Sequence, residues 1–249
     1  MSFSKGWWSD FFHGFIADAQ RKMFPAEVTA ADVRLVDALV GCRPPAKLLD
    51  VPCGTGRIAV ELAALGYDVT GVDLTGEYLE DARAAAAVRN VRLALRESDM
   101  RDLPWRDAFD AAFCIGNSFA YLDRGGNADF VAAVHRVLRP GGVFVLQTNF
   151  AAETILPHLR GRSWFEIGDM TFLHDPVYFP RRGVIETEYT LLRDGGRESR
   201  KAIYQIYMVW ELVELLEAAG FDDVQTIGAA ADEPFRMGCQ TLHLRGVKK

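Results

Sequence analysis

A glycine loop with a carboxylate on either side is the feature of this sequence best suited to chemistry. Asp50 ends a short apolar segment, and Gly54 and Gly56 follow it within the loop 52–56. Glycine lets a backbone approach a ligand closely, and the N-terminus of a following helix offers N–H donors and a partial positive charge. The combination predicts a site for an anionic or nucleoside ligand.

Two further acids narrow the choice of ligand. Asp73 follows Gly56 at about the spacing at which a carboxylate accepts hydrogen bonds from two ribose hydroxyls. Oxidoreductases that bind a nicotinamide dinucleotide share this loop and acid, so a nicotinamide cofactor is one alternative. Asp50 argues against it, because a carboxylate before the loop suits a cation better than a pyrophosphate. Asp99 and Met100 place an acid and an apolar residue where an adenine could bind.

The elements that must position these residues alternate between strand and helix. Short apolar segments bounded by turn residues predict strands, and apolar residues at three- and four-residue steps predict helices. The predicted strands cover residues 46–51, 67–72, 91–96, 109–115 and 143–148, and the predicted helices cover residues 57–65, 77–89 and 129–138. Such alternation in short units predicts a parallel sheet with right-handed crossovers.

The pattern changes after residue 151, where aromatic and β-branched residues alternate with polar ones. This period of two predicts an antiparallel insert with strands in residues 164–173, 183–192 and 197–209. The sequence RDGGR predicts a hairpin turn, because Gly195 and Gly196 tolerate positive φ. The chain then closes with a predicted helix at 210–219 and predicted strands at 221–228 and 241–247.

Composition excludes several classes of protein. The 249 residues carry a formal net charge of −6, which argues against a protein that wraps nucleic acid. The four cysteines lie far apart without a CxxC pair, so neither a zinc site nor a disulfide framework is predicted. Charged residues interrupt every long apolar run, and the expected protein is therefore cytoplasmic and not bound to a membrane.

Four ordered segments make the resemblance to a known family specific. LLDVPCGTGR, GVDLT, ESDMRDLPWRDAFDAAFCIGNSFAYL and HRVLRPGGVFVLQT follow one another as they do in class I S-adenosylmethionine-dependent methyltransferases. The resemblance covers residues 45–149, and the terminal helix and hairpin are similar as well. The cofactor it implies is S-adenosylmethionine, which leaves S-adenosylhomocysteine as its product.

The resemblance implies a role for each residue around the nucleoside. Asp73 would accept from both ribose hydroxyls, with Leu74 against the adenine. Asp99 would accept from the exocyclic amine of the adenine, and Met100 would pack on the ring.

Other residues would hold the methionine arm. Asp50 would lie near the amino group, the backbone at Gly54 and Gly56 would pass under the cofactor, and Gly116, Asn117 and Ser118 would line the arm and face the acceptor. Pro52 departs from the glycine or alanine of many relatives. Because proline has no N–H and fixes φ, we expect it to stiffen the loop and to donate nothing to the ligand.

The expected fold is α/β. Its centre would be a Rossmann-like, seven-stranded, mostly parallel sheet with a C-terminal antiparallel hairpin strand. Four regions are expected: N-terminal helices (1–45), a cofactor-binding core (46–150), an antiparallel insert on the substrate side or at an oligomer contact (151–208), and a helix and hairpin that complete the sheet (209–249).

The function of the N-terminal region has two possible interpretations. Apolar residues from Trp8 to Met23 predict one amphipathic helix that ends at Pro25, and Thr29 is expected to cap a second helix. The segment WWSDFFHGF could be a lid over the cofactor, as in similar methyltransferases, or a helix packed on the core or on a second copy of the chain.

No catalytic residue and no metal ligand are assigned. Methyl transfer is an in-line displacement, so the protein mainly positions the nucleophile and excludes water. His158, His174, Glu166 and Tyr178 could act as bases, but such side chains are more often only solvated. The mixture of aromatic and charged residues at 160–179 suits either a substrate pocket or a homodimer contact.

The acceptor is expected to be a small molecule. GNSFAYL is similar to the corresponding segment of glycine N-methyltransferase, which favours N-methylation over O- or C-methylation. A protein that binds S-adenosylmethionine without catalysis remains an alternative, because the cofactor motifs are the same.

Overall fold

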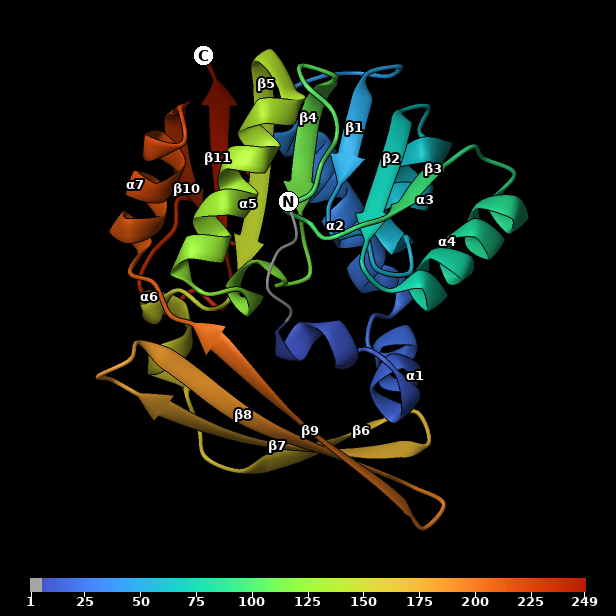
Figure 1. Ribbon diagram of the computed structural model, residues 1–249, viewed down its shortest axis with the longest axis vertical. Coiled ribbons are helices and arrows are strands. Elements are labelled where there is room, and N and C mark those ends of the chain that lie inside the picture. Colours follow the sequence, from blue (N-terminus) through green and yellow to red (C-terminus); the bar gives the residue numbers. More distant parts are fainter. Residues whose placement is uncertain (1–5) are drawn as a thin grey trace.

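The computed structural model describes residues 6–249 and contains two sheets (Figure 1). The main sheet has seven strands in the order β10-β11-β5-β4-β1-β2-β3. Only β11 runs antiparallel to its neighbours, β5 and β10. The strands are β1 (Lys47–Asp50), β2 (Asp68–Asp73), β3 (Ala94–Glu97), β4 (Phe109–Cys114), β5 (Leu138–Thr148), β10 (Phe221–Ile227) and β11 (Leu242–Lys248). The predicted α/β fold is confirmed.

Helices cover both faces of the main sheet, because successive side chains of each strand point to opposite faces. Leu48 packs with α2 (Ala26–Leu39) and α3 (Arg57–Ala64) in one buried cluster. Leu49 packs with α5 (Arg124–Val137) and α7 (Val209–Ala218) in another. In Figure 1 α5 and α7 cover the front of the sheet, while α4 (Gly76–Arg89) lies beside β3 and packs against α3.

The antiparallel insert forms a separate four-stranded sheet below the main one in Figure 1. Its strands are β6 (Ser163–Ile167), β7 (Met170–Phe179), β8 (Val184–Arg193) and β9 (Gly196–Gln205). The expected single strand at 164–173 is instead a hairpin, with Gly168 at φ 59° in its turn. The RDGGR turn is confirmed, but the positive φ values belong to Asp194 and Gly195 rather than to both glycines.

The N-terminal segment differs from the single helix that the apolar spacing predicts. It forms a short 3₁₀ helix, η1 (Trp7–Asp10), and then α1 (Gly14–Lys22), with the break at residues 11–13. The expected cap at Thr29 is also wrong, because α2 begins directly after Pro25. Phe11 and Ile16 pack with the insert in a third buried cluster, so this segment lies between the two sheets (Figure 1).

Ion pairs hold the N-terminal segment on both sides. Arg21 pairs with Asp81 at 2.7 Å and with Glu77 at 3.1 Å, both on α4. On the other side, Asp18 pairs with Arg193 of the insert at 2.8 Å. Lys22 pairs with Asp169 in the same way, and Glu198 accepts from the Phe15 amide at 3.0 Å. The segment is thus fastened to the main sheet's helices and to the insert.

Two boundaries in the core differ from the prediction. Helix α5 starts at Arg124 rather than at residue 129, because the Asp123 side chain accepts from the Gly126 amide at 2.7 Å and caps it. Strand β5 begins at Leu138 rather than at residue 143, so the RPGG segment lies inside the strand. Short elements complete the chain: η2 (Phe119–Tyr121), α6 (Ala152–Ile155) and η3 (Leu156–His158).

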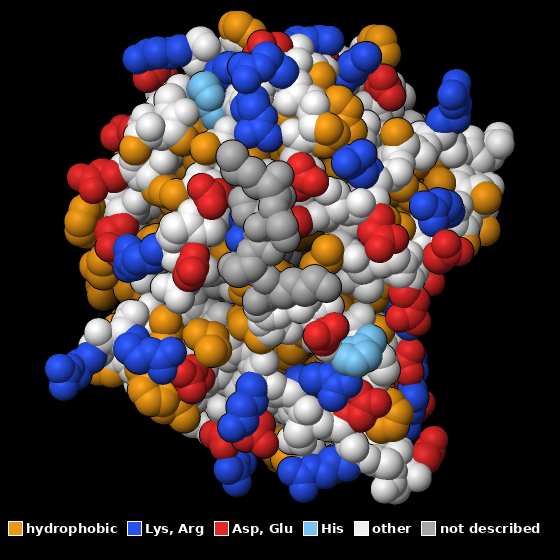
Figure 2. All heavy atoms as spheres, viewed as in Figure 1, with side chains coloured by type: hydrophobic (Ala, Val, Ile, Leu, Met, Phe, Trp, Pro, Cys, Tyr) orange, Lys and Arg blue, Asp and Glu red, His pale blue; other side chains and the backbone are white. Residues whose placement is uncertain are grey.

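The surface carries charges of both signs. On the face drawn in Figure 2, Lys and Arg side chains are interspersed with Asp and Glu over the residues described. Within residues 6–249, every helix falls short of the length and apolar character that crossing a membrane would need.

Candidate active site

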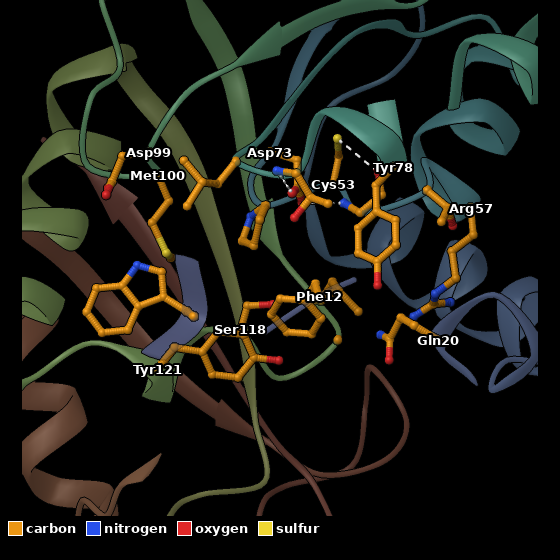
Figure 3. Close-up of a pocket in the computed structure, with 18 of the residues that line it drawn as sticks. Phe12, Gln20, Cys53, Arg57, Asp73, Tyr78, Asp99, Met100, Ser118 and Tyr121 are labelled. Carbon is orange, nitrogen blue, oxygen red and sulfur yellow. Dashed lines mark hydrogen bonds between the residues drawn. The ribbon is translucent and has the colours of Figure 1, made fainter. Parts of the chain in front are cut away.

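A cavity opens where the carboxyl ends of β1, β2 and β4 meet the N-terminal segment (Figure 3). Its empty space is about 890 Å³, counting the part that opens to solvent, which is within the range of small-ligand sites. Many of the predicted site residues line it: Pro52, Gly54, Asp73, Leu74, Asp99, Met100, Gly116 and Ser118. The order of the strands therefore brings together residues that lie far apart in the sequence.

Three predicted residues stand outside the cavity wall. Asp50 is only 3% exposed and lies beneath the loop. Gly56 faces α4, since a Cβ on it would lie 2.8 Å from the Cβ of Ala82. Asn117 turns its side chain to the backbone, where its Oδ1 accepts from the Asn149 amide at 2.7 Å.

Two glycines present bare backbone to the cavity. Gly54 has φ 53° and Gly116 has φ 91°, and a Cβ on either would meet no atom within 4 Å. The Val51–Pro52 peptide bond just before Gly54 is cis. Because a side chain at either glycine would project into open space that a ligand could use, the cavity fits a cofactor that lies close to the backbone.

Asp73 is held in place by backbone amides of the glycine loop and of the segment that follows β2. Its Oδ2 accepts from the Gly54 amide and its Oδ1 from the Thr75 amide, both at 2.8 Å. Burial raises the pKa of Asp73, and these backbone hydrogen bonds offset part of the rise. A carboxylate has about four acceptor sites, so the two bonds leave room for hydroxyl donors.

Asp99 accepts hydrogen bonds from Arg101, which the sequence alone does not predict. Its Oδ1 accepts from the backbone amide and the Nε of Arg101 at 2.9 Å, and its Oδ2 accepts from the Nη2 of Arg101 at 2.7 Å. Burial acts to raise the pKa of Asp99, but the Arg101 bonds and charge outweigh it and lower the pKa. Oδ2 keeps an acceptor site, which is enough for one amine donor.

Asp50 is a buried carboxylate with an electrostatic cost. Burial raises its pKa well above the usual range, while the charge of Arg57 opposes the rise and that of Asp73 adds to it. A backbone hydrogen bond from Ala59 also opposes the rise, but burial outweighs it and favours the neutral form of the carboxyl group. A cation bound near the loop would lower this cost.

Asp50→Asn is expected to stabilise the unliganded protein at pH 7 by on the order of 1–3 kcal/mol. The pKa of Asp50 is raised on folding, so its contribution to stability is present at low pH and is lost as pH rises from its unfolded value, about 3.9, through its folded value. Urea unfolding at several pH values between 4 and 7 should show the variant's advantage growing with pH. A variant that is less stable at pH 7 would contradict this account.

Aromatic side chains close the cavity, and among them Trp8 and Phe12 belong to the segment WWSDFFHGF, for which a lid over the cofactor was one of the two interpretations. Trp8, Phe12 and Phe24 come from the N-terminal segment and its connection to α2, and they face Tyr78 of α4 and Tyr121 of η2. Gln20 and Arg57 complete one end of the wall. Apolar spacing alone does not choose between a lid and a packed helix, because it predicts a buried face without saying what the face covers.

The insert packs against residues of the cavity wall, but those of its residues that the structure describes do not line the cavity itself. Tyr204 of β9 reaches it through Tyr121, with ring centroids 5.8 Å apart, and its ring stacks on Phe150 at 4.1 Å. The insert therefore acts on the cavity through the residues it supports.

The bases considered from the sequence lie outside the described cavity wall. His158 contacts the Gly238 carbonyl oxygen at 2.8 Å, and Glu166 accepts from Thr171. Burial lowers the pKa of His174, which the Asp175 charge only partly offsets. The structure also shows no cluster of His, Cys, Asp and Glu within residues 6–249 that could hold a metal ion.

Comparison with known proteins agrees with this geometry. A family model described as a methyltransferase domain matches residues 48–142. The Bacillus subtilis (strain 168) protein YqeM, provisionally named a methyltransferase, is 34% identical over 190 residues, which cover 70% of this chain and 73% of that protein.

Two further likenesses differ in extent. Glycine N-methyltransferase of Rattus norvegicus is 33% identical over 120 residues, but these cover only 43% of this chain and 40% of that enzyme. The crystal structure of the sugar N-methyltransferase KedS8 from Streptoalloteichus sp ATCC 53650 superposes with a TM-score of 0.69 at 24% identity, over 95% of this chain and 93% of that one, and shows the shared fold. These comparisons favour a methyltransferase over the two alternatives, a nicotinamide-dependent oxidoreductase and a protein that binds S-adenosylmethionine without catalysis. The chain belongs to the class I S-adenosylmethionine-dependent methyltransferases.

Proposed function

We propose that this methyltransferase acts on a small-molecule acceptor, with transfer to nitrogen favoured over oxygen or carbon. The observation that carries the proposal is the cover that Trp8 and Phe12 form over the cavity, because an aromatic-lined pocket of this size suits a small molecule. The names of KedS8, a sugar N-methyltransferase, and of rat glycine N-methyltransferase support the same class of acceptor and the same acceptor atom.

In this proposal the cofactor lies along the carboxyl ends of β1 to β3. Asp73 accepts from the ribose hydroxyls, and the free acceptor site of Asp99 takes the adenine amine. Leu74 and Met100 pack on the adenine, while the open backbone at Gly54 lies under the methionine arm. The remaining wall residues that we assign to the cofactor side are Pro52, Gly116 and Ser118. Asp50 acts from beneath the loop through its charge, and Gly56 and Asn117 act by shaping the backbone.

The side chains of the cavity have two tasks during transfer. When bound, S-adenosylmethionine supplies an electrophilic methyl group on a sulfonium. Phe12, Ile115 and Tyr121 exclude water, and the chain holds the acceptor nucleophile in line at about 3–3.5 Å. Burial raises the pKa of Tyr121, so its hydroxyl stays protonated and orients the acceptor by hydrogen bonding instead of acting as a phenolate base.

Turnover with a panel of acceptors tests the proposal. We expect S-adenosylhomocysteine to accumulate only when a suitable amine or amino sugar is present, and mass spectrometry should place the new methyl group on nitrogen. Phenols and carbon acids of similar size are the matched comparison for the acceptor atom. Turnover with RNA or protein alone would contradict a small-molecule acceptor.

A further inference from the structure

One end of the cavity holds a buried hydroxyl without a partner. Tyr78 of α4 is 3% exposed, and its hydroxyl oxygen has no hydrogen-bond partner among the described residues. Phe12 packs near its ring at 6.1 Å between centroids. Figure 3 shows the hydroxyl pointing towards Gln20 within the cavity. Because an unsatisfied buried hydroxyl destabilises the fold, this position indicates a ligand group that bonds to it.

Two more donors lie at the same end. Arg57 is the first residue of α3, directly after the glycine loop, and its Nη1 pairs with Asp32 at 2.6 Å. Its guanidinium also lies 4.2 Å from the centre of the Phe24 ring, so its position is fixed. A guanidinium has five N–H donors, and this ion pair leaves others for a ligand. Gln20 of α1 adds an amide beside them in Figure 3.

A hydroxyl, an amide and a guanidinium together suit a carboxylate. Each offers an N–H or O–H donor, and hydrogen bonds from such groups to a carboxylate are roughly twice as strong as those between neutral groups. We propose that Tyr78, Gln20 and Arg57 bind the carboxylate of the methionine tail of S-adenosylmethionine. The inference rests on the proposed placement of the cofactor in this cavity.

The carboxylate could belong to the methionine tail of the cofactor or to the acceptor substrate. The order of residues along the cavity favours the methionine tail. In Figure 3 Asp99 and Met100 lie at one end, Asp73 in the middle, and Tyr78 and Arg57 at the other end. A cofactor with its adenine at Asp99 and its ribose at Asp73 therefore extends its tail towards the three donors.

Decarboxylated S-adenosylmethionine, which keeps the sulfonium and the amine but lacks the carboxylate, provides the test. Calorimetry with the full-length protein should show that Tyr78→Phe binds S-adenosylmethionine about tenfold or more weakly, while its affinity for the decarboxylated form stays within about twofold. Gln20→Glu should weaken S-adenosylmethionine more strongly, because it adds a like charge, and should leave the decarboxylated form bound as well or better. These two forms of the cofactor also exclude an acceptor carboxylate as the explanation, since no acceptor is present.

A stability measurement separates ligand binding from a structural role. Tyr78→Phe removes an unsatisfied hydroxyl, so the unliganded variant should melt at the same temperature or higher. Tyr67→Phe is the matched control, because the Tyr67 hydroxyl bonds to Asp37 at 2.7 Å and to the Cys42 carbonyl oxygen at 3.0 Å, away from the cavity. It should lower the melting temperature and leave the affinity for both cofactor forms unchanged.

The outcomes distinguish this inference from the proposed function. Equal losses for both cofactor forms in Tyr78→Phe and Gln20→Glu would overturn the carboxylate assignment and leave the cofactor site in place. Failure of the unaltered protein to bind either form would overturn the cofactor placement itself.

Discussion

Asp73→Ala is expected to weaken S-adenosylmethionine binding by more than about a hundredfold. The carboxylate is the acceptor for two ribose hydroxyls in the proposed site, and each hydrogen bond to a charged group contributes about 1.5–3 kcal/mol. The same side chain also orders the site, because it accepts from the amides of Gly54 and Thr75. Titration calorimetry with S-adenosylmethionine measures the loss, and circular dichroism checks that the variant is folded.

Two variants keep this prediction decisive. Asp68→Ala removes the exposed carboxylate at the other end of the same strand and should leave the affinity within about twofold. Asp73→Asn keeps one acceptor oxygen and loses the charge, so its affinity should fall between those of Asp73→Ala and the unaltered protein. If folded Asp73→Ala binds the cofactor almost as well as the unaltered protein, the ribose assignment is wrong.

Gly54→Leu is expected to abolish detectable cofactor binding while the protein stays folded. A side chain at this position meets no protein atom within 4 Å, so it would occupy the cavity instead of displacing its neighbours. The positive φ of 53° adds a strain of about 1–2 kcal/mol, which lowers stability but does not unfold a domain of ordinary stability. Thermal unfolding and calorimetry on the same sample measure both effects.

Two glycines serve as matched controls. Gly195→Leu carries similar strain at φ 77° in the turn of the insert, also with open space around it, and should bind the cofactor normally. Gly56→Leu should mainly destabilise the fold, because its side chain would collide with Ala82 of α4. Normal cofactor binding by Gly54→Leu would show that the ligand does not pass over this backbone.

The core could be predicted from the sequence because its signals are local. Strands β1 and β4 are short apolar runs, β5 contains one at residues 143–146, and helices such as α3 repeat apolar residues along one face. Strand β3 carries little of this signal, because its residues are mostly exposed. The start of α5 was missed because Gly125 and Gly126 in its first turn look like a loop. The break after η1 was missed because apolar residues continue across it at helical spacing.

The candidate site was predictable only in part, for a different physical reason. Asp73 and Gly54 follow from the chain order, since the ends of neighbouring parallel strands meet at one edge of the sheet. The bidentate pairing of Asp99 with Arg101 depends on the fold of a loop, which residue types alone do not specify. The contribution of Trp8 and Gln20 depends on where the N-terminal segment docks, and that is a tertiary property.

Two residues of α1 hold the N-terminal segment in place. Arg21 pairs with Asp81 of α4 on one side, and Asp18 pairs with Arg193 of the insert on the other. Surface ion pairs of this kind contribute at most about 1 kcal/mol each, so a few substitutions could shift the segment without unfolding the core. The insert is joined to the same segment through Arg193 and Glu198, and that segment supplies Trp8, Phe12 and Gln20 to the cavity wall. A mutation in the insert that shifts the segment would therefore change both the cover of the cavity and the contacts proposed for the cofactor, although it lies outside the cavity wall.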